Sequence, residues 1–162
     1  RFSAGDLQLK SGEICRKIET EPEYRRARTV FLYWPMPGEA DLRQLLHDNS
    51  EKRFYLPVVL ENGRMAFGEY RGPESLVRSE LGIMEPGQTA LLEVGEADLI
   101  LAPGIAFTID GKRLGRGGGF YDRLMEERKT NQVVWGAAFD FQLLDDLPMA
   151  EHDFAVDRVF VG

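Results

Sequence analysis

The hydrophobic residues of this chain follow two patterns, and the alternation of these patterns predicts an α/β protein. Apolar residues between positions 7 and 18 recur with the spacing of one or two amphipathic helices, behind a variant capping box at residues 3–6. Residues 29–34 form an apolar run that stops before two prolines, which predicts a central strand covered on both faces. Residues 98–102 predict a second buried strand.

The other segments continue this alternation. Strands are predicted over residues 54–60, 65–70, 133–138 and 154–160, and helices over residues 41–46, capped by Asp41, and over residues 121–129. The Glu-Asn-Gly-Arg turn at residues 61–64 predicts a short antiparallel hairpin, whereas residues 80–87 are expected to be irregular because Glu85 precedes a proline. Strands that alternate with helices favour a mostly parallel sheet with helices on both faces, a three-layer, Rossmann-like arrangement.

Size and charge narrow the classes of function. The 162 residues, 43% of them hydrophobic, fit a single domain. The net charge of −7 argues against nucleic acid or an anionic membrane as partner, so an anion has to bind at a local basic patch. One cysteine, Cys15, excludes an internal disulfide, and no membrane-length apolar run or signal-peptide pattern is present, so a cytoplasmic protein is expected.

The basic patch is the segment Gly-Lys-Arg-Leu-Gly-Arg-Gly-Gly-Gly-Phe-Tyr-Asp at residues 111–122. Glycines let backbone N–H groups approach an anion, and a helix that begins near Phe120 would add the positive end of its dipole. Arg113 and Arg116 can bind phosphate oxygens, and Asp122 can hold a divalent cation. The segment matches neither the Walker loop nor the dinucleotide fingerprint, and a glycine-rich surface turn with solvated cations is the alternative.

Four loops follow predicted strands: residues 35–41, 61–64, 103–122 and 139–153. In a parallel sheet, ligands bind beyond the carboxyl ends of the strands, so the first and third loops are the expected walls of one site. Phe141, Leu143 and Leu144, in the last loop, are expected in the core.

Several ordered motifs resemble the 5-formyltetrahydrofolate cyclo-ligases, also called methenyltetrahydrofolate synthetases. The motifs are Tyr33-x-Pro-x-x-x-Glu39, Gly82-Ile-x-Glu-Pro86, Pro103-Gly-Ile-Ala-Phe107, the segment at residues 111–123, Phe139-x-x-Gln142, Leu147-Pro148 and His152-Asp153. The resemblance covers nearly the whole chain. It implies one cyclo-ligase-like domain over residues 1–162, and because such enzymes begin with a helix carrying a lysine and an arginine that have no match ahead of Ser3, the N-terminal helix is expected to be incomplete.

The resemblance also implies an activity. Members of the family use ATP and Mg²⁺ to close 5-formyltetrahydrofolate to 5,10-methenyltetrahydrofolate, with release of ADP and phosphate. The formyl oxygen is thought to be phosphorylated before the N10 amine attacks the carbon, and such a transfer needs positioning and charge neutralisation. The expected partners are therefore ATP and 5-formyltetrahydrofolate, and the protein is expected to be a monomer.

Residue roles follow from the same resemblance. Arg116 and Tyr121 are the expected catalytic residues. The expected ATP site is Arg113, Leu114, Gly115, Arg116, Gly117, Gly118, Gly119, Phe120 and Tyr121; the expected folate site is Trp34, Glu39, Glu85, Phe120 and Tyr121; and the expected Mg²⁺ ligands are Asp122 and Asp153.

Other interpretations stay open at this point. Trp34 ends an apolar strand and suits the core, Glu39 suits a solvated turn, and Asp153 suits a cap. Leu81, where family members often carry an aromatic residue, and Thr108, where many carry an acid, motivate a folate- or nucleotide-binding module without turnover. A sugar-phosphate enzyme on a related fold would need an acid/base pair near the glycine loop, and the sequence offers none that we identify.

Overall fold

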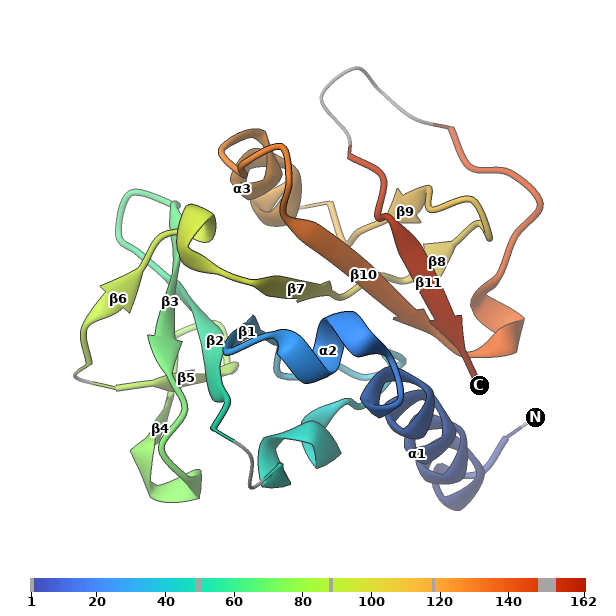
Figure 1. Cartoon of the computed structure of the whole chain (residues 1–162), viewed down its shortest axis with the longest axis horizontal. Helices are drawn as coiled ribbons and strands as arrows, with labels where there is room; N and C mark the ends of the chain where they lie inside the picture. Colours follow the sequence, from blue (N-terminus) through green and yellow to red (C-terminus); the bar gives the residue numbers. More distant parts are fainter. Residues whose placement is uncertain (1, 49–50, 88, 118, 149–153) are drawn as a thin grey trace.

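The computed structural model describes residues 2–48, 51–87, 89–117, 119–148 and 154–162, and its centre is a mostly parallel sheet (Figure 1). The sheet contains β1 (Thr29–Phe31), β2 (Arg53–Val59), β3 (Met65–Glu69), β6 (Leu91–Leu92), β7 (Leu99–Ala102), β10 (Val133–Ala138) and β11 (Arg158–Val161), in the order β11-β10-β7-β1-β2-β3-β6. The pairs β11–β10, β10–β7, β7–β1 and β1–β2 are parallel, and the pairs β2–β3 and β3–β6 are antiparallel. The predicted fold class and the central position of β1 are confirmed.

The helices are short except for the first. They are α1 (Ala4–Glu19), α2 (Pro22–Arg26) and α3 (Phe120–Glu126), with the 3₁₀ turns η1 (Arg43–His47), η2 (Pro73–Ser75), η3 (Val94–Glu96) and η4 (Asp140–Gln142). Two small hairpins complete the fold: β4 (Leu76–Arg78) with β5 (Met84–Pro86), and β8 (Ala106–Phe107) with β9 (Arg113–Leu114). None of the described helices is long and apolar enough to cross a membrane.

The predicted capping box at the start of α1 is present. The backbone N–H of Asp6 donates to Ser3 Oγ at 3.1 Å, and the backbone N–H of Ser3 donates to Asp6 Oδ2 at 3.0 Å. These two bonds satisfy N–H groups that the first helical turn leaves without partners. The apolar spacing therefore forms one continuous helix, which directs Ile14, Cys15 and Ile18 into the core.

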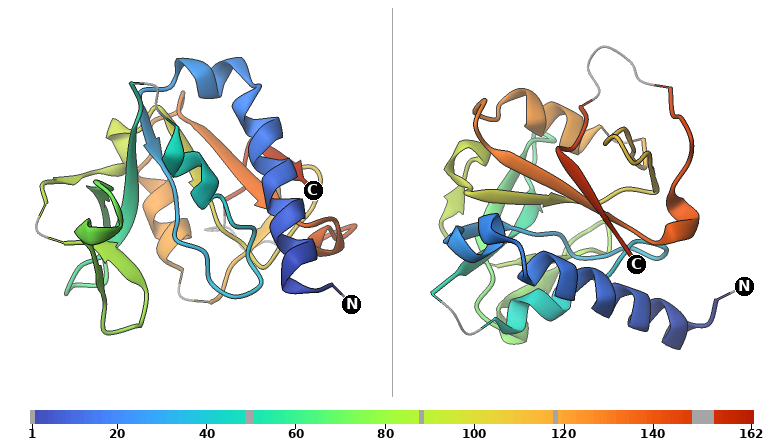
Figure 2. Two further views of the ribbon diagram at one scale, coloured as in Figure 1. Left: turned by 90° about the horizontal axis from the view of Figure 1, so that it is seen from below. Right: turned by 45° about the vertical axis from the view of Figure 1, so that its right-hand side comes forward.

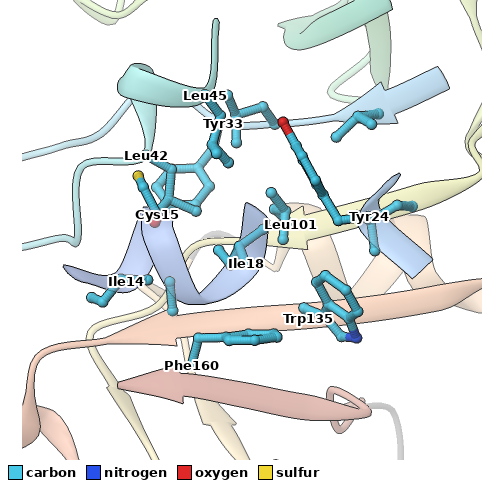
Figure 3. Close-up of a cluster of buried hydrophobic side chains, with 14 of the residues drawn as sticks. Ile14, Cys15, Ile18, Tyr24, Tyr33, Leu42, Leu45, Leu101, Trp135 and Phe160 are labelled. Carbon is cyan, nitrogen blue, oxygen red and sulfur yellow. The ribbon is translucent and has the colours of Figure 1, made fainter. Parts of the chain in front are cut away.

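Alternate residues of the central strands point to opposite faces of the sheet, and each face has its own core. On one face, Leu101 and Trp135 pack against α1 and α2 (Figure 3). Val30 belongs to the same cluster. On the other face, Phe31, Ile100 and Val134 pack with residues of α3. Figure 2 shows α1 and α2 on the side of the sheet opposite α3. Helices therefore cover both faces, as the sequence predicts, and β1 is buried on both sides.

Some elements differ from the sequence-based expectation. The predicted helix after Asp41 is the 3₁₀ turn η1, whose N-cap is Leu42, and Asp41 instead binds both the backbone N–H and the guanidinium of Arg43. The 80–87 segment is not wholly irregular, because Met84–Pro86 pairs with β4 across a turn. The β8–β9 hairpin occupies a region that was expected to be loop throughout.

Cys15 is fully buried, and its sulfur lies 3.9 Å from the backbone oxygen of Asp41. Burial raises the pKa of the thiol to about 12, with smaller contributions from nearby carboxylates. Since the thiolate is the reactive form, this cysteine is a core residue rather than a nucleophile.

Candidate functional site

Three loops meet at the carboxyl edge of the parallel sheet. They follow the neighbouring strands β1, β7 and β10 and comprise residues 32–42, 103–117 and 139–148. In Figure 1 the arrowheads of β7 and β10 point toward the same edge, next to the β8–β9 hairpin. Since parallel strands bring their carboxyl ends together, residues far apart in the sequence become neighbours here.

Arg116 and Glu39 join the first two of these loops. Arg116 Nε lies 3.4 Å from Glu39 Oε2, and Arg116 Nη2 donates to the backbone oxygen of Pro37 at 2.7 Å. The other carboxylate oxygen, Glu39 Oε1, accepts the backbone N–H of Met36 at 2.8 Å. The Glu39 side chain is only 5% exposed, whereas that of Arg116 is 39% exposed. A nearly buried carboxylate is thus compensated, and a cation remains accessible to solvent beside it.

Arg113 has a different environment from Arg116. Its side chain is 7% exposed, its Nε donates to the Pro103 backbone oxygen at 2.5 Å, and its Nη1 lies 3.7 Å from Asp122 Oδ1. The guanidinium also lies over the rings of Tyr121 and Phe154, at 5.4 and 5.3 Å from their centroids. Arg113 therefore fastens the β8–β9 hairpin to α3, and its charge reaches the surface much less than that of Arg116.

Tyr121 carries a buried hydroxyl. Within the described residues, this oxygen has no hydrogen-bond partner, and burial raises the pKa of the phenol above its usual value. A buried polar group without a partner costs roughly 1–3 kcal/mol. The hydroxyl is protonated at neutral pH, so a buried hydrogen-bond donor without a partner among the described residues lies in the first turn of α3.

The glycines of the loop have separate roles. Gly117 and Gly119 have φ values of 94° and 70°, and a Cβ added to Gly117 would meet nothing within 4 Å. These two glycines provide the left-handed backbone of an open loop that ends at α3. Gly111 has a φ of 100°, and its Cβ would lie 2.1 Å from the backbone oxygen of Val156, so it is required by packing. Gly118 lies outside the described residues.

The remaining residues of the predicted ATP site surround this loop. Leu114, at the end of β9, is 45% exposed, and a Cβ on Gly115 would lie 3.0 Å from the guanidinium of Arg113. Phe120 begins α3, as predicted, and lies under the guanidinium of Arg123, whose central carbon is 5.1 Å from the ring centroid.

Trp34 and Glu85 lie at the same edge of the sheet, further from the glycine loop in sequence. Trp34 is half-buried against the core on the α1 face, with the Arg43 guanidinium 4.8 Å from its ring centroid, so part of it belongs to the core. Glu85 Oε2 accepts the backbone N–H of Val59 at 3.1 Å and thereby fastens the β4–β5 hairpin to the carboxyl end of β2. Both expected substrate residues thus have structural contacts of their own.

Leu81 and Thr108 have opposite surroundings. Leu81 lies in the turn of the β4–β5 hairpin and is 66% exposed. Thr108 is buried, its hydroxyl bonds Asp110, and it accepts the backbone N–H of Lys112 at 3.0 Å. Thr108 therefore closes the turn of the β8–β9 hairpin.

Asp122 is the expected metal ligand that lies within the described residues. It lies in the first turn of α3 with its side chain 21% exposed, and Asp153 falls outside the described residues. The described ranges contain no group of three His, Cys, Asp or Glu side chains that could hold a metal ion. Mg²⁺ is commonly bound by one or two carboxylates together with substrate phosphates, and Asp122 fits that mode.

A pocket of about 360 Å³ lies beside Arg116. Its lining comes from all three carboxyl-edge loops: Pro37, Gly38, Ile105, Ala106, Arg116, Phe141, Gln142 and Leu144. The expectation that Phe141 and Leu144 are core is wrong, because they are 50% and 46% exposed in this pocket, whereas Leu143 does pack against a core cluster. Among the lining residues, Ile105 and Gln142 belong to motifs of the family resemblance, but the sequence analysis assigns neither of them a role in the site.

Comparisons with known proteins agree with one another. The model of the 5-formyltetrahydrofolate cyclo-ligase family matches residues 2–162. A 5-formyltetrahydrofolate cyclo-ligase of Mycolicibacterium smegmatis is 38% identical over 82% of this chain and 72% of its own length, and that of Escherichia coli K12 is 35% identical over 91% and 85%. The NMR structure of Aquifex aeolicus 5,10-methenyltetrahydrofolate synthetase superposes with a TM-score of 0.87 at 32% identity, covering 99% of this chain and 81% of that one.

Proposed function

This chain belongs to the 5-formyltetrahydrofolate cyclo-ligase family, and we propose that it closes 5-formyltetrahydrofolate to 5,10-methenyltetrahydrofolate with consumption of ATP in the presence of Mg²⁺. The observation that carries the proposal is the contact between Arg116 and Glu39. The first residue belongs to the expected phosphate loop and the second to the expected folate loop, so the two substrates would meet where these side chains meet.

The reaction explains why a cation is needed there. The formyl oxygen attacks the γ-phosphorus of ATP, the bond to the bridging oxygen breaks, and ADP leaves. The N10 amine then attacks the activated carbon and loses its proton, and inorganic phosphate departs with the former formyl oxygen. Negative charge on the transferring phosphoryl group has to be neutralised in both steps, and the accessible guanidinium of Arg116 supplies a positive charge with a fork of donors.

Glu39 and Tyr121 offer complementary groups for the folate. The carboxylate of Glu39 accepts hydrogen bonds and is held in place by the Met36 backbone N–H, while the phenol of Tyr121 is a buried donor. A pterin ring carries both N–H donors and ring acceptors, so these two groups can orient it. Burial of both side chains favours a single arrangement, which brings the formyl group to a fixed place relative to Arg116.

Mg²⁺, when bound, would neutralise and orient the phosphates of ATP. We assign Asp122 as one ligand and keep Asp153 as a proposed second ligand. Asp122 lies close to Arg113, so this carboxylate is held in position from one side and can present its other oxygen to a cation. Arg113 is therefore proposed to orient Asp122 more than to contact phosphate itself.

The test is an omission assay with the purified protein. Formation of 5,10-methenyltetrahydrofolate is followed from 5-formyltetrahydrofolate, ATP and Mg²⁺, and each component is left out in turn. Product is expected only when all three are present, with one ADP released per turnover. Folate binding by calorimetry without ADP release would overturn the proposal and favour a binding module.

A further inference from the structure

Gln142 lies where the three carboxyl-edge loops meet. Its side-chain Nε2 donates to the backbone oxygens of Gly38, at 3.1 Å, and Ile105, at 2.9 Å. Its Oε1 accepts the backbone N–H of Phe139 at 2.8 Å. The residue is 7% exposed, so one buried amide connects the segments that follow β1, β7 and β10.

Two of these bonds lead directly to Arg116. Gly38 lies between Pro37 and Glu39, the two residues that hold the guanidinium. Ile105 donates its backbone N–H to the Leu114 backbone oxygen at 2.8 Å, two residues before Arg116. The amide therefore sets the distance between the backbone that carries Arg116 and the turn against which its side chain rests.

Among side chains of this size, only that of glutamine can form all three hydrogen bonds. The amide donates two hydrogens to two carbonyl oxygens and accepts one hydrogen, all within one planar group. A glutamate would face the two carbonyls with oxygens of its own, and a methionine would fill the space without any hydrogen bond. The chemistry of the position is thus specific to glutamine.

We propose that Gln142 is a positioning residue for the reaction, which holds the turn at Pro37–Glu39 and the β8–β9 hairpin in register and so directs the guanidinium of Arg116 toward the transferred phosphoryl group. The inference rests on the proposed function for its kinetic consequence. Its geometric consequence, the fixed environment of Arg116, does not depend on the activity.

The chain contains a matched control in Gln132. That residue is 8% exposed, its Nε2 donates to the backbone oxygens of Val94 and Ala97 at 2.7 Å each, and its Oε1 accepts the Lys129 backbone N–H at 2.8 Å. The hydrogen-bond pattern is the same, but Gln132 immediately precedes β10 and lies at the opposite edge of the sheet. Gln132→Met and Gln142→Met therefore remove the same kinds of hydrogen bond. Those of Gln142 lie beside the candidate site, and those of Gln132 lie at the other edge of the sheet.

The experiment compares both variants with the wild type. Both substitutions are expected to lower Tm, because each removes three hydrogen bonds of a nearly buried amide. The decrease should be somewhat smaller for Gln132→Met, since the Val94 oxygen still accepts the Ala97 backbone N–H at 3.2 Å. Only Gln142→Met is expected to lower kcat, by on the order of 10²-fold, since a misplacement of about 1 Å costs that much. Its KM for ATP is expected to change much less, because the lost alignment acts in the transfer step.

A second readout is independent of turnover. The Nε–Hε resonance of Arg116, assigned with Arg116→Lys, is expected to shift in Gln142→Met and to stay in place in Gln132→Met. If Gln142→Met does not fold, Gln142→Asn is used in its place, because its side chain is one methylene shorter. Its effects on kcat and on the Arg116 resonance are expected to have the same direction and to be smaller.

The outcomes separate the two proposals. Equal turnover in the two glutamine variants, or an unchanged Arg116 resonance, would overturn the role of Gln142 while the cyclo-ligase assignment stands. An inactive wild type whose Arg116 resonance still shifts in Gln142→Met would overturn the proposed function and support the positioning role.

Discussion

Gly111→Ala tests whether the first glycine of the loop serves the fold rather than a ligand. The residue has a φ of 100°, and an added Cβ would lie 2.1 Å from the Val156 backbone oxygen. Around it, the Gly111 backbone N–H donates to the Thr108 oxygen at 3.0 Å, and its own oxygen accepts the Val156 N–H at 2.8 Å. The methyl group can be accommodated only if the β8–β9 turn separates from the segment that leads into β11.

The size of the effect follows from these contacts. A left-handed conformation costs an alanine about 1–2 kcal/mol, and loss of the hydrogen bond from the Val156 N–H to the Gly111 oxygen adds about 1 kcal/mol, so the expected destabilisation is about 2–3 kcal/mol. For a chain of this length, each kcal/mol corresponds to about 2–4 °C in Tm, which gives a decrease of about 4–12 °C.

Gly63→Ala is the matched control. Gly63 has a φ of 78°, in the β2–β3 turn, and its Cβ would meet nothing within 4 Å, so only the backbone term applies. Thermal unfolding followed by circular dichroism should give the highest Tm for the wild type and the lowest for Gly111→Ala. Gly63→Ala should lie between them, with a Tm about 2–8 °C below that of the wild type. If Gly111→Ala is no less stable than Gly63→Ala, the contact with Val156 does not require glycine and our reasoning is wrong.

Three further predictions concern charge and protonation. Arg116→Ala should lower turnover by about 10³-fold or more, and it should also lower Tm because it leaves the nearly buried Glu39 carboxylate without its cation; wild-type turnover would remove Arg116 from the mechanism. Asp122→Asn should raise the Mg²⁺ concentration needed for half-maximal activity, whereas an unchanged Mg²⁺ titration would exclude Asp122 as a ligand. Because burial raises the pKa of Cys15 to about 12, unfolding releases a proton at high pH, so the stabilisation is complete below about pH 9 and is lost as the pH rises toward 12. Cys15→Ala should reduce the loss of Tm over that interval, and an identical pH profile would contradict the assignment.

The sequence was sufficient for the elements whose signals are local. The continuous apolar run at residues 29–34 predicts a central strand buried on both faces, and β1 has that position, although it covers only Thr29–Phe31. The Asn-Gly turn before β3 and the Ser3–Asp6 capping box are likewise set by neighbouring residues. The family resemblance, confirmed by the comparisons, came from ordered motifs rather than from any single one.

The remaining features depend on contacts between distant segments. The two-residue strands β8 and β9 lack a periodic pattern, and β8 is held in part by the Leu144 backbone N–H, which donates to the Phe107 oxygen at 2.8 Å. Arg113 and Arg116 lie in the same glycine-rich segment, and the sequence gives no reason to expect different exposure. Packing nevertheless buries the guanidinium of Arg113 and leaves that of Arg116 accessible. Similarly, the motif Phe139-x-x-Gln142 accounts only for the local bond of Gln142, whereas its bonds to Gly38 and Ile105 join it to two distant loops and cannot be predicted from the neighbouring residues.

The packing of the first helix on the last strand has a consequence for folding during synthesis. Lys17 Nζ, near the end of α1, donates to the Val161 backbone oxygen at 2.6 Å, and the core beneath α1 includes Phe160 (Figure 3). On the ribosome, the apolar face of α1 is made long before its partner β11, so the contacts of Ile14 and Ile18 with that strand form late. Contacts this distant in sequence slow folding, and the exposed helix face is a natural target for a chaperone until β11 emerges.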